Sequence, residues 1–247
     1  MTPAEFALLG ATGLFTAALT AMIGFGGGTI LIAVMLLFLP PAVVIPLHGL
    51  VQLFANSWRV FLFRRHIGWH LVWRFTLLMP FGILVGLWFF QGLSKEAIQV
   101  LIGSVVLFSL FTRNLKPFRG KDLPLGAFIP LGFAVGILNM MVGVVGPLMG
   151  ALVVRKELKK EQVIGTLGFF GLIGHVMKVG AFGLVGFRFM DHLPSLAVLI
   201  PGVMLGVVLG KWMLGFFNER IFMVAFQGLL VALSFKLIVV DGLFKLF

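Results

Sequence analysis

The sequence contains no cysteine in its 247 residues. This absence excludes disulfide bonds, catalytic thiols and thiolate metal sites, and it leaves the cellular compartment open. The phosphate-binding motif G-x-x-x-x-G-K-[ST], the metal motif H-E-x-x-H and a Ser-His-acid grouping are also missing. We therefore predict that the protein is not an enzyme, binds no cofactor and no metal, and does not use ATP to drive transport.

Charge is scarce as well, and acidic charge is the scarcer kind. Only 11% of the residues are charged, and 19 Lys and Arg against 8 Asp and Glu give a net charge of +11. A basic balance can indicate nucleic-acid binding, but the cations here fall in short loops between apolar stretches. That pattern is typical of the cytoplasmic side of a membrane. The predicted partner is the lipid bilayer, with no nucleic acid.

Apolar residues fill the remaining sequence in long, continuous stretches. With 60% hydrophobic residues and a mean hydropathy of +1.15, the composition predicts an all-α polytopic membrane protein. A β-barrel is disfavoured because apolar and polar residues do not alternate within these stretches. The predicted segments are 5–23, 28–40, 42–63, 70–91, 97–112, 123–142, 147–155, 162–183, 192–214 and 220–240.

Two of these segments, 28–40 and 147–155, are too short to cross about 30 Å of hydrocarbon easily. Each follows a glycine cluster, Gly24–Gly28 in one case and Gly143–Pro147 in the other. Broken backbone at membrane depth is stable only where it is packed in protein or lines a polar cavity. A helix that begins at Thr29 would direct free N–H groups toward the glycines, which outlines an anion site. Alternatively, the glycines only allow close helix packing, and the short segments either cross or re-enter.

The two glycine clusters suggest an internal repeat. Gly24 and Gly143 lie 119 residues apart, and the same offset aligns Arg59 with Lys178. We predict one integral membrane domain made of two transmembrane repeats, 1–116 and 117–247. Five segments per repeat require the repeats to be inverted, and glycine-broken segments at matching positions indicate the binding site of a transporter near the membrane midplane.

Loop charge predicts the orientation. Segments 59–74, 113–121 and 155–160 each hold four Lys or Arg residues, so these basic loops should face the cytoplasm and both termini should lie outside. The predicted location is the bacterial cytoplasmic membrane (the cell inner membrane), which the chain crosses several times.

Polar residues inside the segments 42–63 and 162–183 are candidates for the site. His48, Gln52, Asn56 and Arg59 share one face of a helix, and a polar stripe in lipid must face protein or water. The second segment offers Thr166, His175 and Lys178. All eight acids lie at segment ends or in loops, so an intramembrane Arg and Lys without a carboxylate indicate a bound anion as the missing partner.

Other roles for these side chains stay open. Arg59 could reach the lipid headgroups, the histidines could join neighbouring helices by hydrogen bonds, and Asn139 could cap broken backbone or contact the ligand. The predicted substrate-binding residues are Gly24, Gly26, Gly27, Gly28, His48, Gln52, Asn56, Arg59, Asn139, Gly143, Gly146, His175 and Lys178.

The sequence resembles the TauE/SafE family of sulfite exporters. The resemblance rests on the motif Gly24-Phe25-Gly26-Gly27-Gly28, on its looser repeat Gly143–Pro147 and on a length near 250 residues, and it covers essentially the whole chain. It implies export of sulfite or of a small organosulfonate such as sulfoacetate.

We therefore predict a secondary transporter that exports a small oxyanion across the cytoplasmic membrane by alternating access. A passive anion channel is the first alternative, and a membrane-embedded enzyme or assembly factor is the second. A homodimer is the oligomer that we consider alongside the monomer.

Overall fold

The computed structural model describes residues 2–112, 122–143, 146, 149, 158–214, 227–228 and 230–244. All regular secondary structure in these ranges is helical, as predicted. The predicted segment 147–155 lies outside the described residues except for Met149, and so does the first part of segment 220–240.

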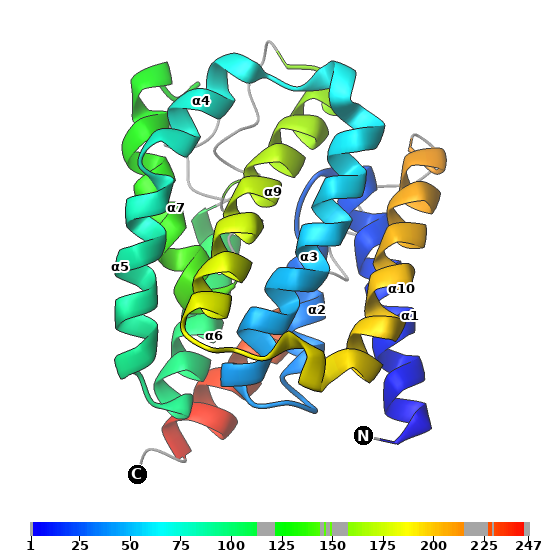
Figure 1. Cartoon of the computed structure of the whole chain (residues 1–247), viewed down its shortest axis with the longest axis vertical. Coiled ribbons are helices and arrows are strands. Elements are labelled where there is room, and N and C mark those ends of the chain that lie inside the picture. The colour runs from blue at the N-terminus through cyan, green and yellow to red at the C-terminus, as the bar shows by residue number, and fades with distance from the viewer. Residues whose placement is uncertain are drawn as a thin grey trace.

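The described helices follow the predicted segments closely (Figure 1). In chain order they are α1 (Pro3–Ile23), α2 (Gly27–Met35), α3 (Pro41–Phe63), η1 (Arg64–His66), α4 (Trp69–Leu77), α5 (Met79–Gly92), α6 (Lys95–Thr112), η3 (Leu125–Ala127), α7 (Phe128–Val142), α9 (Lys160–Leu184), η4 (Phe189–His192), α10 (Leu193–Trp212) and the π-helical η5 (Lys236–Leu243).

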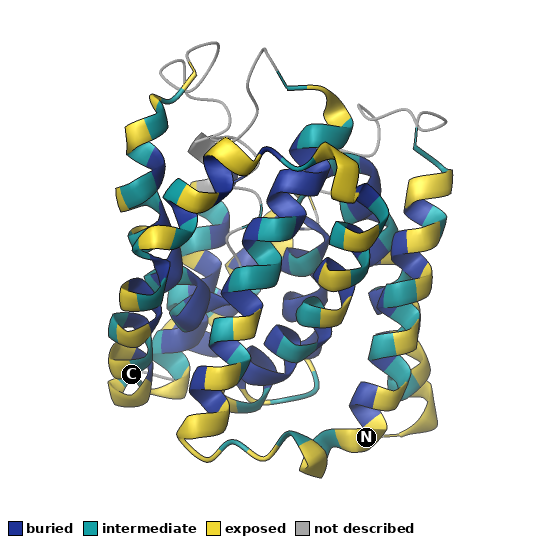
Figure 2. Cartoon of the chain, turned by 45° about the horizontal axis from the view of Figure 1, so that its top comes forward, coloured by how far each residue is buried: buried dark blue, intermediate teal, exposed yellow. Residues whose placement is uncertain are grey.

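Several of these helices are long and apolar enough to cross a membrane. Four of the described helices meet this test, and a fifth is added if the bent pair α4 and α5 counts as one span. Exposed residues lie on the outward faces of the helices (Figure 2), and many are large apolar side chains such as Phe81, Trp88 and Leu205. An apolar outer surface of this kind suits contact with lipid tails.

The first glycine cluster turns the chain back on itself between α1 and α2. Gly24 ends α1 with a φ of 97°, and Gly26 precedes α2 with a φ of 100°, so both adopt conformations that a side chain disfavours. Gly27 then packs so tightly against the Thr16 carbonyl that a Cβ there would clash. The first residue of α2 therefore lies beside the last two turns of α1, and α2 returns toward the end where α1 began (Figure 1).

Two helix pairs pack closely through glycine. Gly206 and Gly210 of α10 lie against the backbone of α1 at Leu14 and Ala18, so these two helices are parallel. On the other side of the molecule, α5 and α7 pack in the same way, with glycines of both helices against backbone carbonyls of the partner. Small residues let the helix backbones approach closely, and close approach provides most of the attraction between helices in lipid.

The centre of the molecule is the antiparallel pair α3 and α9 (Figure 1). Gly168 lies against Arg59, Gly171 against Asn56, and Gly49 against Lys178. The glycines of one helix therefore face the long polar side chains of the other. This arrangement explains why α9 is rich in glycine and how large polar groups fit inside the fold.

The predicted segment 70–91 is not one straight helix. It is broken at Leu78 into α4 and α5, which meet at an angle of 44°. Pro80 explains the break, because its ring occupies the space of a helical carbonyl and it has no N–H to donate.

The end of α3 and the start of α9 bring several of the described basic residues to one end of the molecule. The segment Arg64–His66 lies against the start of α9 at Gly165, close to Lys159 and Lys160. At this same end, the exposed Lys211 of α10 donates to the Leu62 carbonyl at 3.0 Å. The opposite end holds the start of α3 and the loop that follows α9 (Figure 1).

Candidate anion-binding site

A cavity of about 90 Å³ lies where the two glycine breaks meet. Gly24, Gly26 and Gly28 line it from the first break, and Gly143 and Gly146 line it from the second. The two breaks are in contact, since a Cβ on Gly146 would lie 3.3 Å from the Gly26 nitrogen. The volume has room for a few water molecules or one small anion.

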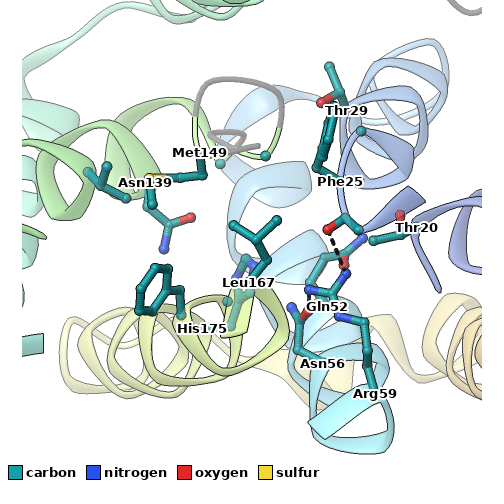
Figure 3. Close-up of a pocket in the computed structure, with 18 of the residues that line it drawn as sticks. Thr20, Phe25, Thr29, Gln52, Asn56, Arg59, Asn139, Met149, Leu167 and His175 are labelled. Atoms are coloured by element: carbon teal, nitrogen blue, oxygen red, sulfur yellow. Dashed lines mark hydrogen bonds between the residues drawn. The ribbon is translucent and has the colours of Figure 1, made fainter. Parts of the chain in front are cut away.

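Arg59 occupies one end of this cavity (Figure 3). Its Nη1 donates to the carbonyl of Gly24 at 3.2 Å, and its Nη2 donates to Oδ1 of Asn56 at 2.6 Å. The guanidinium is thus held at the C-terminal end of α1, where the helix dipole favours a cation. Its buried Nε has no hydrogen-bond partner among the described residues and lies against Gly168 of α9.

The N-terminus of α2 supplies a second set of donors. Among the described residues no side chain caps this end, and both the N-cap residue Gly26 and Gly28 line the cavity. The buried hydroxyl of Thr29 lines it too and has no hydrogen-bond partner in the part of the chain that the structure describes. His48 holds the start of the helix in place, because its Nε2 lies 3.0 Å from the Gly28 carbonyl oxygen. An uncapped helix N-terminus beside a cavity favours an anion.

The opposite wall comes from α7 and α9. Asn139, in the last turn of α7, lies at the end of the cavity away from Arg59 (Figure 3). His175 of α9 also lines the cavity, and its ring centroid lies 6.1 Å from that of His48. The Nδ1 atoms of both histidines are buried without a partner in the described part of the chain.

The charge of the lining has one sign. Arg59 is a cation, and none of the described residues that line the cavity is acidic. The lining therefore combines one cation with neutral donors, which is the combination that a small oxyanion requires.

Two predicted site residues do not line the cavity. Gly27 is packed against α1, as described above. Lys178 is fully buried behind Gly49 and Gly143, and within the described structure its Nζ has no hydrogen-bond partner. A Cβ on Gly143 would lie 3.2 Å from this Nζ. All the other predicted residues line the cavity.

Lys178 and Arg59 nevertheless occupy corresponding places. Arg59 lies at Gly24, the glycine that ends α1, and Lys178 lies at Gly143, the glycine that ends α7. In both cases 35 residues separate the glycine from the cation. The helix dipole explains part of this placement, because each cation lies near the negative end of a helix.

Thr166 has a different role from the one that its polarity suggested. Its buried hydroxyl accepts a hydrogen bond of 2.8 Å from the N–H of Gly68, in the turn before α4. It therefore fixes a turn and does not reach the cavity.

The apolar part of the lining could not be predicted from the sequence. Phe75 and Phe170 stack with ring centroids 4.0 Å apart, and both line the cavity. The further apolar residues are Phe25, Met79, Val135, Met149 and Leu167, and Thr20 and Gly171 also line the cavity. Apolar residues are abundant in every segment, so the sequence does not distinguish those of the lining from those of the core.

These features define an α-helical, multi-pass membrane protein whose internal cavity lies between broken helices, an arrangement typical of transporters. Residues 9–237 match the family "Sulfite exporter TauE/SafE", nearly the whole chain, and the protein therefore belongs to this family of membrane exporters of sulfite and sulfonate-type anions. No curated protein and no solved structure matches the chain.

Proposed function

We propose that the protein exports sulfite or a small organosulfonate from the cytoplasm and binds it in the cavity between the two glycine breaks. The observation that carries this proposal is the lining itself: one fixed guanidinium, a helix N-terminus that no described side chain caps, and the buried Thr29 hydroxyl, which has no partner among the described residues, all around a space for one small anion. Sulfite and sulfonates present several oxygen acceptors on one sulfur, which such a set of donors can bind together.

The proposed mechanism is alternating access by two inverted repeats, 1–116 and 117–247. The packing supports it in two ways. The helices that would be equivalent, α3 with α9 and α6 with η5, are antiparallel where they touch, as inversion requires. The pairs α1–α10 and α7–α5 are both parallel and both packed through glycine. This is expected if the first helix of each repeat, α1 or α7, packs against a helix of the other repeat, α10 or α5, that holds an equivalent position. Rocking of one repeat against the other would expose the cavity to each side in turn.

The proposed orientation places the end with Arg64–His66, Lys159, Lys160 and Lys211 in the cytoplasm, following the rule that basic loops face inward. Helix α2 returns toward the end of the molecule where α1 begins. In this orientation that end is outside, so the N-terminus lies outside and α2 does not need to cross the membrane. In the same orientation Arg59, near the end of α3, would be the first buried cation of the site that an anion from the cytoplasm reaches.

The test is the thermal stability of the purified protein with a panel of anions: sulfite, sulfate, sulfoacetate, acetate and chloride, with taurine as a zwitterion. A ligand that binds only the folded state raises the melting temperature by mass action. We expect a selective rise with sulfite or sulfoacetate, and a loss of that rise in Arg59→Gln. Equal effects of all anions, or a selective rise that persists in Arg59→Gln, would contradict the proposed site.

A further inference from the structure

A second cavity lies at the end of the molecule away from the basic loops. It measures about 410 Å³, and its lining includes Pro41 at the start of α3, Phe182 in α9 and the exposed Lys95. In the proposed orientation this cavity would open to the outside. The two cavities share no lining residue, so a wall of protein separates them.

Lys178 stands in that wall. His175 lines the first cavity and Phe182 lines the second, and Lys178 lies between them on the same face of α9. The same spacing occurs on α3, where His48 lines the first cavity and Pro41 the second. Seven helical residues rise about 10 Å, so a side chain in the middle of the wall is within reach of both cavities.

The wall contains a buried ammonium, that of Lys178, to which no described acceptor is hydrogen-bonded. The Lys178 Nζ and the Nδ1 atoms of His48 and His175 are buried and unpaired within the described chain. A Cβ placed on Gly143 would lie 3.2 Å from Nζ of Lys178 and 3.8 Å from Nδ1 of His48. Cδ1 of Ile32 lies only 2.8 Å from the same point, so the wall is closed here and must open for an anion to pass. A buried ammonium without a partner is costly in a membrane protein and marks a functional position.

We propose that Lys178 forms a second anion station, in the wall between the two cavities, through which the oxyanion released from the Arg59 end passes on its way out. The station takes the same small oxyanion as the first cavity, and this inference rests on the proposed function. Arg59 and Gly49, against which Lys178 packs, lie ten residues apart on α3, a rise of about 15 Å. Arg59 lines the first cavity and Lys178 does not, so the two cations occupy different levels of the α3–α9 pair.

The test compares binding with transport. Lys178→Met removes the ammonium with little change in volume, and Lys211→Met removes an exposed ammonium at the far end of the molecule as the matched control. Sulfite affinity is measured by calorimetry on purified protein, and labelled sulfite flux is measured in proteoliposomes. We expect Lys178→Met to keep the affinity within about twofold while the flux falls about tenfold or more, because only the passage is impaired. Lys211→Met should change neither.

Two results would overturn the inference while leaving the proposed function standing. If Lys178→Met lowers affinity and flux together, as Arg59→Gln should, both cations belong to one site. If it transports at the wild-type rate, the ammonium is not on the path. A wild-type protein that neither binds nor moves sulfite or sulfoacetate would instead contradict the proposed function itself, and this inference with it.

Discussion

Replacing Lys178 by methionine should make the folded protein more stable while it stops transport. The Nζ of Lys178 is fully buried and has no partner in the described residues. A lysine in the middle of a membrane helix costs about 2.5 kcal/mol or more. The helix dipole at the end of α7 stabilises the ammonium and offsets up to about 1 kcal/mol of this cost. The remaining cost is about 1.5 kcal/mol, which methionine would remove.

This free energy corresponds to a rise in melting temperature of about 3–6 °C for a chain of this size. The rise can be followed by tryptophan emission on heating the detergent-purified protein, which contains five tryptophans. Saturating sulfite should raise the melting temperature of both proteins by nearly the same amount, because Lys178→Met leaves the affinity of the first cavity nearly unchanged. A fall in melting temperature would refute the reasoning, since breaking a buried pair costs about 3–5 kcal/mol and would mean that Lys178 is paired within the fold.

Three further outcomes follow from the packing. Gly27→Ala should destabilise the protein by about 1–3 kcal/mol, because the new Cβ would clash with a backbone carbonyl that cannot move aside. The control is Gly180→Ala, which has open space around it and should be neutral or slightly stabilising in the same thermal assay. Thr166→Val should cost about 1–3 kcal/mol by leaving a buried N–H in the turn before α4 unpaired, and unchanged sulfite affinity would separate this role from one in the site. The cysteine-free chain also permits a clean topology test: in spheroplasts an impermeant thiol reagent should label Met190→Cys and leave Arg65→Cys unlabelled, and the reverse would invert the proposed orientation.

Much of the site could be predicted because it depends on residues that are rare in their surroundings. Gly24 and Gly26 stand out as a cluster, and the structure shows that both need a positive φ. The polar stripe from His48 to Arg59 stands out in an apolar helix, and all four of its members line the cavity. A polar side chain in lipid has few places to go, so its spacing alone indicates the inner face of the helix.

The remaining features depend on which helix each side chain faces in the folded protein. The spacing of residues along one helix does not contain that information. Thr166 is as polar as His175 and lies on the same helix, but it faces the turn at Gly68 while His175 faces the cavity. Lys178 is separated from the cavity only because the backbone at Gly143 passes in front of it. The bend at Leu78 could have been placed from Pro80, whereas its angle depends on how α4 and α5 pack against α7.

If the protein binds and exports a small oxyanion as a carrier, it must show sulfite counterflow in proteoliposomes loaded with unlabelled sulfite. We expect a transient accumulation of labelled sulfite above its outside concentration, a flux that saturates with concentration, and loss of both in Arg59→Gln. A flux that rises linearly with sulfite and shows no counterflow would contradict the carrier mechanism and indicate a channel.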